Sequence, residues 1–157
     1  MRRFALLAAI VVVSTPAGAD EPPLSRLTGE WRAKGTVEGE AVTYCAEGRM
    51  VLMGQHLRFS MMDAAKNPRY EATVYISKSK SKGDLVAHWL DNFGADGARV
   101  VGFGEETDGG FVLSFDYGEA VFSDHFEFLN DDSFTLKIDA CVADTCNPFA
   151  DYVFSRR

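Results

Sequence analysis

The sequence has little basic charge and few residues of the kind that bind metals. Its 157 residues include 16 Lys or Arg against 23 Asp or Glu, a formal net charge of −7. Nucleic acids and anionic lipid surfaces attract basic proteins, so neither is an expected partner of so acidic a chain. The three histidines and three cysteines show no CxxC spacing and no His beside a Cys. The sequence therefore predicts no metal site and no resident cofactor.

Long apolar runs are also missing beyond the first nineteen residues, and none approaches the roughly 18 residues of a transmembrane helix. Residues 1–19 combine a basic start, "MRR", an apolar run, "FALLAAIVVV", and the small residues "AGA" at 17–19. This pattern is typical of a secretory signal peptide. We therefore expect a mature single domain of residues 20–157 that is exported to the bacterial periplasm or secreted.

The cysteines are Cys45, Cys141 and Cys146. Export permits disulfide bonds. Cys141 and Cys146 could face each other across a short hairpin loop, where the separation of their Cα atoms would suit a bond. The sequence favours this pairing and leaves Cys45 free, and a bond from Cys45 to either of the others is the alternative.

Helical periodicity is almost absent, and apolar and polar residues alternate in ten segments separated by turn-forming residues. The predicted strands are 29–37, 40–46, 49–62, 70–77, 84–91, 98–105, 110–117, 119–129, 133–141 and 149–156, after a helical turn at 22–27. Short links make successive strands antiparallel neighbours. Because an open sheet would leave two unpaired edges, we predict an all-β, up-and-down meander of about ten strands closed into a barrel, with a sandwich as the alternative.

The glycines of "GFGEETDGG" at 102–110 do not match a phosphate-binding loop, because no third glycine of the required spacing and no helix follow them. We interpret the region as a hairpin in which Gly102 and Gly104 let the sheet bend.

Several segments together resemble the lipocalin-like (calycin) superfamily of β-barrels, and within it small exported bacterial domains of unknown function. They are "LTGEW" at 27–31, "RMVLMGQHL", "YEATVYIS", "HWLDNFG" and the terminal "DYVFSRR". The resemblance implies that Trp31 of the Gly29-x-Trp31 motif plugs one end of the barrel. It further implies that Arg156 or Arg157 covers the indole ring, and that the interior binds a small apolar molecule.

Candidate ligand-binding residues come from the inward faces of the predicted strands. Phe and Met side chains, like those at Met53 and along the later strands, can adapt to an apolar ligand in a barrel interior. His56 and His125 are expected to face outward, whereas both neighbouring faces of His88 are apolar and it is expected to point inward. The residues predicted to contact ligand are Phe59, Met61, His88, Trp89, Phe103, Phe115 and Phe126.

Asp124 shares a predicted face with Phe122 and Phe126, so it is expected to be buried, where a carboxyl needs a partner or its pKa rises. The sequence favours a binder of a small apolar or amphipathic molecule without chemistry, and no catalytic residue is assigned. One alternative is an isomerase or cyclase using Asp124 with His88 or Tyr75 as an acid–base pair. An exported protein-binding inhibitor is another, and haem bound by an inward His88 is less favoured.

Overall fold

The computed structural model describes residues 23–157, so the predicted signal peptide lies outside the described residues. A four-residue helix, α1 (Pro23–Arg26), precedes the first strand, and a 3-10 turn, η1 (Gly97–Arg99), lies between the fifth and sixth. No helix in this part of the chain is long and apolar enough to cross a membrane. The strands are β1 (Gly29–Val37), β2 (Glu40–Val51), β3 (His56–Asp63), β4 (Glu71–Lys78), β5 (Leu85–Asp91), β6 (Gly102–Thr107), β7 (Gly110–Asp116), β8 (Val121–Asn130), β9 (Ser133–Val142) and β10 (Thr145–Arg156).

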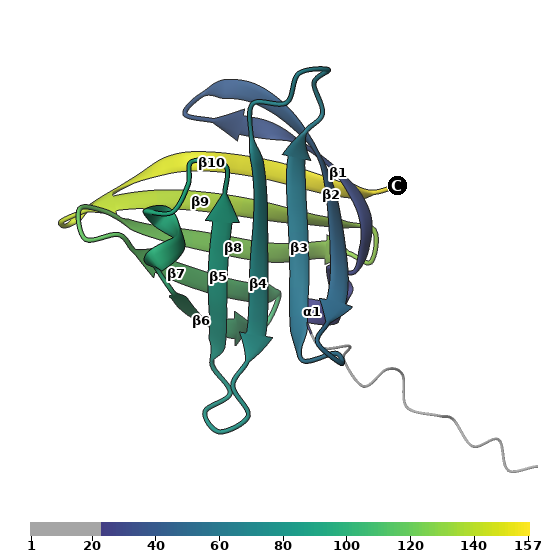
Figure 1. Ribbon diagram of the computed structural model, residues 1–157, viewed down its shortest axis with the longest axis vertical. Coiled ribbons are helices and arrows are strands. Elements are labelled where there is room, and N and C mark those ends of the chain that lie inside the picture. Colours follow the sequence, from purple (N-terminus) through teal and green to yellow (C-terminus); the bar gives the residue numbers. More distant parts are fainter. Residues whose placement is uncertain (1–22) are drawn as a thin grey trace, which may run out of the picture.

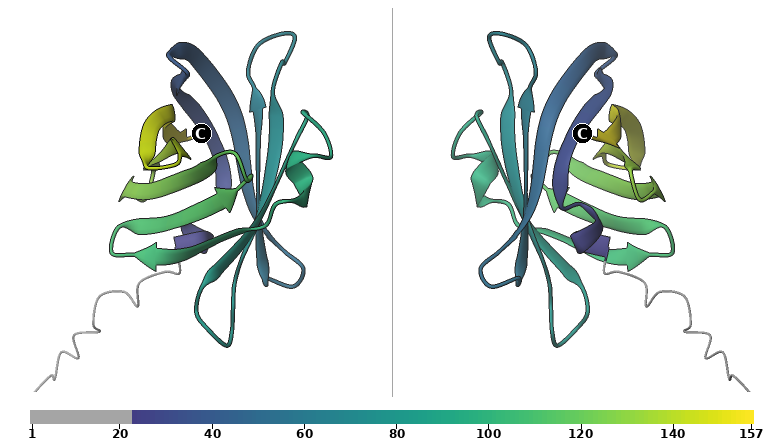
Figure 2. Two further views of the ribbon diagram at one scale, coloured as in Figure 1. Left: turned by 90° about the vertical axis from the view of Figure 1, so that its left-hand side faces the viewer. Right: turned by 90° about the vertical axis from the view of Figure 1, so that its right-hand side faces the viewer.

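Every strand pairs antiparallel with the next, and β1 closes the ring by pairing with β10. This confirms the predicted all-β meander, its closure and the helical turn before β1. Strands β3, β4 and β5 run upright in Figure 1 and cross a layer of β8, β9 and β10. The side views of Figure 2 show these two layers facing each other, with α1 beside the start of β1.

The break predicted between the strands 40–46 and 49–62 is wrong, because β2 continues through it to Val51. Gly48 serves close packing instead of a turn: a Cβ atom there would lie 2.0 Å from the carbonyl oxygen of Leu27. The chain turns at Leu52 and Met53, both of which adopt positive φ angles (49° and 58°). Met53, expected in the interior, is therefore at the tip of this turn and 100% exposed.

One end of the barrel, called here the helix end, holds α1 and the last residues of β10. Trp31 is buried there and its Nε1 donates a hydrogen bond to the carbonyl oxygen of Leu27 (2.9 Å). The ring of Phe134 packs edge-on against Trp31, with 4.9 Å between centroids, and stacks on Phe154 at 4.4 Å. Burial of a phenylalanine side chain stabilises a folded protein by about 1.5–3 kcal/mol. Phe134 and Phe154 are fully buried, so their packing stabilises this end of the barrel.

Arg156 covers the outside of this core. Its guanidinium carbon lies 4.2 Å from the centre of the Trp31 ring. Nη1 donates to the carbonyl oxygen of Thr28 (2.8 Å) and Nη2 to that of Asp131 (2.9 Å). Gly29 has a φ of 115°, and a Cβ atom there would lie 2.5 Å from Nη1 of Arg156, so glycine leaves room for the guanidinium.

Candidate ligand-binding site at the tyrosine end of the barrel

The opposite end, where β1 passes into β2 and β9 into β10, is called the tyrosine end because Tyr44, Tyr70, Tyr117 and Tyr152 lie there. Most of the half-buried apolar residues that pack against the core gather at this end, whereas the helix end has only Phe128 among those described. The seven at the tyrosine end are Val37, Val42, Tyr70, Trp89, Val100, Phe122 and Phe149. The core is therefore covered at one end and partly exposed at the other.

Several aromatic rings at the tyrosine end meet edge to face. The centroid of Tyr44 is 5.6 Å from that of Tyr152 and 5.9 Å from that of Tyr70. Trp89 lies 6.2 Å from Phe115. These rings come from four different strands and the segment before β4, and the closed sheet brings them together at this end of the interior.

Asp124 on β8 is buried, with 3% exposure, and its charge acts on the phenols of Tyr70, Tyr117 and Tyr152. Its burial agrees with the alternation of the β8 sequence. None of the described residues donates a hydrogen bond to its carboxyl group, and no described Lys or Arg is buried. Burial raises the pKa of Asp124 from 3.8 to about 7, because loss of solvent disfavours the charged form.

The phenol groups around Asp124 remain protonated at neutral pH. Burial raises the pKa of Tyr70, Tyr117 and Tyr152, and the charge of Asp124 adds to the increase at each. The hydroxyl of Tyr70 accepts a hydrogen bond from Trp89 Nε1 (3.3 Å). This end of the interior thus combines aromatic ring faces, neutral hydroxyls and one carboxyl without a partner.

Two further carboxylates lie at the rim, at the ends of β3 and β5. Asp63 accepts hydrogen bonds from the backbone N–H groups of Ala65 (2.9 Å) and Arg69 (3.3 Å), which hold its pKa below its usual range. The pKa of Tyr70 is raised by burial and also by the charge of Asp91. Carboxyl groups therefore lie both inside the tyrosine end and at its rim, where Arg69 is a nearby basic residue.

Phe103, predicted to line the interior, instead lies on the outer wall and is 59% exposed. Gly102 takes the inward position beside it, and the ring of Phe115 occupies the space where a Cβ of Gly102 would be (2.5 Å). The alternation was assigned one residue out of phase here, which moves every side chain to the other face.

The inward orientation predicted for His88 is also wrong. Trp89 takes the inward position, and His88 is exposed with its Nε2 2.6 Å from the carbonyl oxygen of Ala98. Tyr75 likewise points away from the interior, in register with His88 on the outer wall. Neither residue therefore forms the expected acid–base pair with Asp124, and His88 is not placed to bind a haem inside the barrel.

The remaining candidates are on the interior side. Phe59, Met61, Phe115 and Phe126 are buried, and Trp89 is half-buried. Phe59 and Phe126 contact the packed rings of the helix end, so they belong to the core of that half. Phe115 and Trp89 lie at the tyrosine end.

The sequence reasoning missed Tyr44, Tyr70 and Tyr152. Tyr44 and Tyr152 alternate with outward-facing residues on β2 and β10, so their inward direction could have been found from the pattern. Tyr70 precedes β4 and shows no such pattern. Its place becomes evident only when closure of the barrel sets it beside Tyr44.

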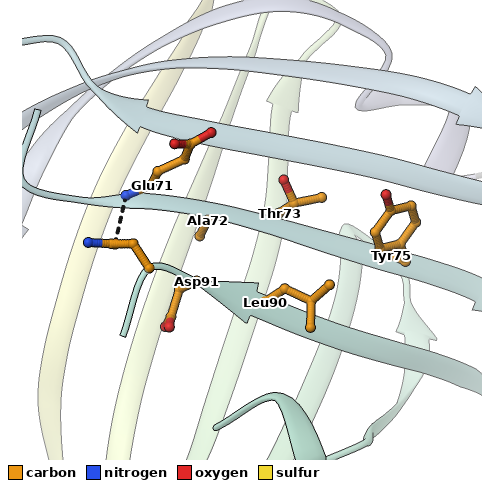
Figure 3. A pocket seen from close by; sticks show the side chains of 7 residues that line it. Glu71, Ala72, Thr73, Tyr75, Leu90 and Asp91 are labelled. Carbon is orange, nitrogen blue, oxygen red and sulfur yellow. Dashed lines mark hydrogen bonds between the residues drawn. The ribbon is translucent and has the colours of Figure 1, made fainter. Parts of the chain in front are cut away.

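Two shallow hollows of about 380 and 340 Å³ lie on the outer wall. The first runs along β4 and β5, where Glu71, Thr73 and Tyr75 lie beside Leu90 and Asp91 (Figure 3). The second crosses β1 to β4 and includes Cys45. Within residues 23–157, no three His, Cys, Asp or Glu side chains are grouped to hold a metal ion.

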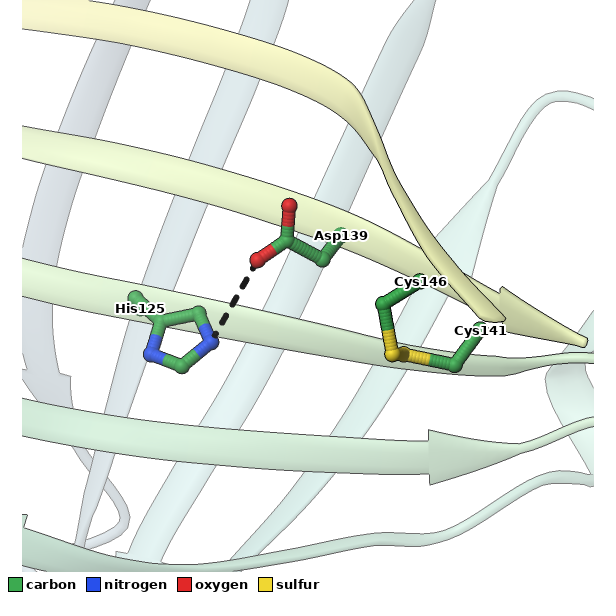
Figure 4. The surroundings of a disulfide bond; sticks show 4 residues. All are labelled: His125, Asp139, Cys141 and Cys146. Atoms are coloured by element: carbon green, nitrogen blue, oxygen red, sulfur yellow. Dashed lines mark ion pairs between the residues drawn. A yellow bond between two sulfur atoms is a disulfide. The ribbon is translucent and has the colours of Figure 1, made fainter. Parts of the chain in front are cut away.

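The predicted disulfide between Cys141 and Cys146 is confirmed, and it joins β9 to β10 at the tyrosine end, with 4.0 Å between Cα atoms. Cys45 is free. Figure 4 shows His125 near the disulfide on the outer wall, where its Nε2 lies 3.8 Å from Asp139 Oδ2.

No family model and no curated protein sequence matches this chain. Among solved structures, it is similar to a redesigned β-barrel with 9% sequence identity and a TM-score of 0.46, over 86% of this chain and 95% of the other. This similarity is too low to bear on function, and the strand pairing itself establishes the fold.

Proposed function

We propose that this protein is an exported, lipocalin-like barrel that binds a small amphipathic molecule at its tyrosine end. The observation that supports this most is the asymmetry of the interior. The helix end is covered by Trp31 and Arg156, whereas half-buried aromatic residues collect around Asp124 at the other end.

An apolar ligand would gain free energy by covering the half-buried rings of Trp89, Phe122 and Phe149. Each Å² of apolar surface removed from water contributes about 25 cal/mol, before the costs of association are subtracted. The rings of Phe122 and Phe149 meet edge to face, with 5.2 Å between their centroids, and both are half-buried.

Export and family membership are parts of the same proposal. The signal-like pattern of residues 1–19 and the disulfide at Cys141–Cys146 support export, because disulfides persist in oxidising compartments. The contact of Arg156 with Trp31 is the arrangement that the lipocalin-like resemblance implies.

The test uses N-phenyl-1-naphthylamine, a neutral dye whose fluorescence rises on transfer to an apolar site. We expect the dye to bind the wild-type protein, and Phe122→Ala to weaken it at least fivefold. Phe128→Ala is the matched control, because Phe128 is also half-buried on the inward face of β8 but lies at the helix end. Absence of binding, or an equal loss in both variants, would contradict the proposed site.

Native mass spectrometry of the protein purified from the exported fraction identifies the natural ligand. A bound mass of a few hundred daltons that is reduced in Phe122→Ala and retained in Phe128→Ala is the expected result.

A further inference from the structure

Asp124 is a buried carboxyl group that the described protein leaves without a counter-ion. At 3% exposure it has lost nearly all contact with water, and neither a hydrogen-bond donor nor a buried basic side chain in residues 23–157 replaces it. Burial of an unpaired carboxylate is costly, and in most proteins such a group has a partner. A missing partner at a candidate binding site indicates that the ligand supplies it.

The groups around Asp124 suit a cation better than an anion. The charge of Asp124 raises the pKa of the phenols of Tyr70, Tyr117 and Tyr152. Trp89 donates a hydrogen bond to the hydroxyl of Tyr70. The faces of aromatic rings are electronegative and attract organic cations, and most strongly when the site is shielded from water.

The rim has the same preference. Asp63 and Asp91 lie at the ends of β3 and β5, and Arg69 is the basic residue whose charge acts on this cluster. An approaching cation would be attracted by these carboxylates, and an anion such as a fatty acid would be repelled.

We propose that the ligand is an amphipathic organic cation, with an ammonium group beside Asp124 among the phenol rings and an apolar body against Trp89, Phe115 and Phe122. This inference rests on the proposed function, because it assigns the chemical class of the ligand to the same site.

The test is displacement of N-phenyl-1-naphthylamine by three molecules with the same twelve-carbon chain: dodecyltrimethylammonium, dodecanol and dodecanoate, each used below the concentration at which it forms micelles. The trimethylammonium group keeps its charge at every pH. We expect it to displace the dye from the wild-type protein at a concentration about tenfold lower than dodecanol does, with dodecanoate weakest, since a paired and ring-enclosed cation is worth about 1.4 kcal/mol or more.

Asp124→Asn keeps the size of the side chain and removes its charge. In this variant the cation should lose its advantage over dodecanol, to within about threefold, while the affinity for dodecanol itself changes little. Asp139→Asn is the control, because Asp139 lies on the outer wall of the neighbouring strand and the substitution likewise replaces one carboxyl group by an amide. That variant should keep the full preference for the cation.

The outcomes separate the two proposals. If dodecanol or dodecanoate equals the cation in the wild-type protein, the cationic class is wrong although the binding site stands. If the preference for the cation survives Asp124→Asn, Asp124 is not the group that binds the ammonium, and that part of the proposal is wrong. If neither the dye nor any of the three molecules binds, the proposed function itself is wrong. Repetition at 0.5 M NaCl distinguishes the rim from the interior, because a preference due to Asp63 and Asp91 would be screened and one due to buried Asp124 would persist.

Discussion

Trp31 and Arg156 are register partners across the strand pair that closes the barrel, and the guanidinium carbon of Arg156 lies 4.2 Å from the centre of the indole ring. The same guanidinium donates hydrogen bonds to the carbonyl oxygens of Thr28 and Asp131. One side chain thus joins the first strand, the last strand and two connecting segments.

Arg156→Ala should lower the free energy of unfolding by about 1–3 kcal/mol, because it removes a cation–π contact and leaves carbonyl groups without their donor. Arg157→Ala is the matched control, since the Arg157 side chain is exposed, and it should change stability by less than about 0.5 kcal/mol. Urea denaturation of both variants gives the comparison. Equal effects would mean that Arg156 does not cover the indole in solution.

Gly102→Ala should destabilise the barrel by about 1–3 kcal/mol, because the new methyl group would lie 2.5 Å from the ring of Phe115 and force it to move. Gly109→Ala is the control, since the nearest atom to a Cβ there, Cγ of Glu127, is 3.8 Å away. The same experiment reports on the site, because a displaced Phe115 ring should also weaken binding of the dye. A fully stable Gly102→Ala protein would exclude this packing.

The turn between β2 and β3 should be easy to improve. Leu52 and Met53 both have positive φ, a conformation that costs most L-residues about 1 kcal/mol or more and that asparagine and glycine adopt readily. The double variant Leu52→Asn, Met53→Gly should therefore raise the thermal midpoint. Leu129→Asn, which changes an exposed leucine elsewhere, should leave it unchanged. A lower midpoint in the double variant would indicate that these two side chains have a contact that favours the turn.

Asp124 should make stability depend on pH. Its pKa is about 7 in the folded protein and near 3.8 without burial, so the folded form holds the proton more tightly. Below pH 4 both forms are protonated, and between about pH 4 and 7 the unfolded chain loses its proton first. The free energy of unfolding should therefore fall as pH rises through this range and level off above it, by on the order of 4 kcal/mol at most.

The measurement is the difference in unfolding free energy between wild type and Asp124→Asn from pH 4 to pH 8. The phenols of Tyr70, Tyr117 and Tyr152 stay protonated over this range and cancel in the difference, and Asp91 is present in both proteins. A difference that does not change with pH would show that Asp124 is solvated or paired in solution.

The strands could be predicted from the sequence because each has one buried face, which produces a clear alternation. Prediction failed where this signal weakens. Gly48 was assigned to a turn although it lies within β2, since a glycine needed for close packing looks the same in sequence as one needed for a turn. His88 and Phe103 were assigned to the wrong face because apolar residues occupy both sides of their strands, and β5 and β6 share few paired positions that would fix the register.

The site was harder to predict than the fold. Burial of Asp124 followed from its apolar neighbours on β8, but the partners proposed for it, His88 and Tyr75, lie on the outer wall. The phenols near it come from β10, from the segment before β4 and from the loop after β7. Only the closed sheet determines that these distant segments meet at one end of the interior.

Because β1 and β10 close the barrel, the fold can be completed only after the last strand has been made. Hairpins between successive strands can form as soon as both strands exist, but β1 lacks its second neighbour until the end of the chain is made. The covered helix end depends on the same late partner, because Phe134, Phe154 and Arg156 all belong to the last two strands. Contacts between residues so distant in sequence form slowly. We therefore expect the newly made chain to remain an open sheet until the final strand completes the ring.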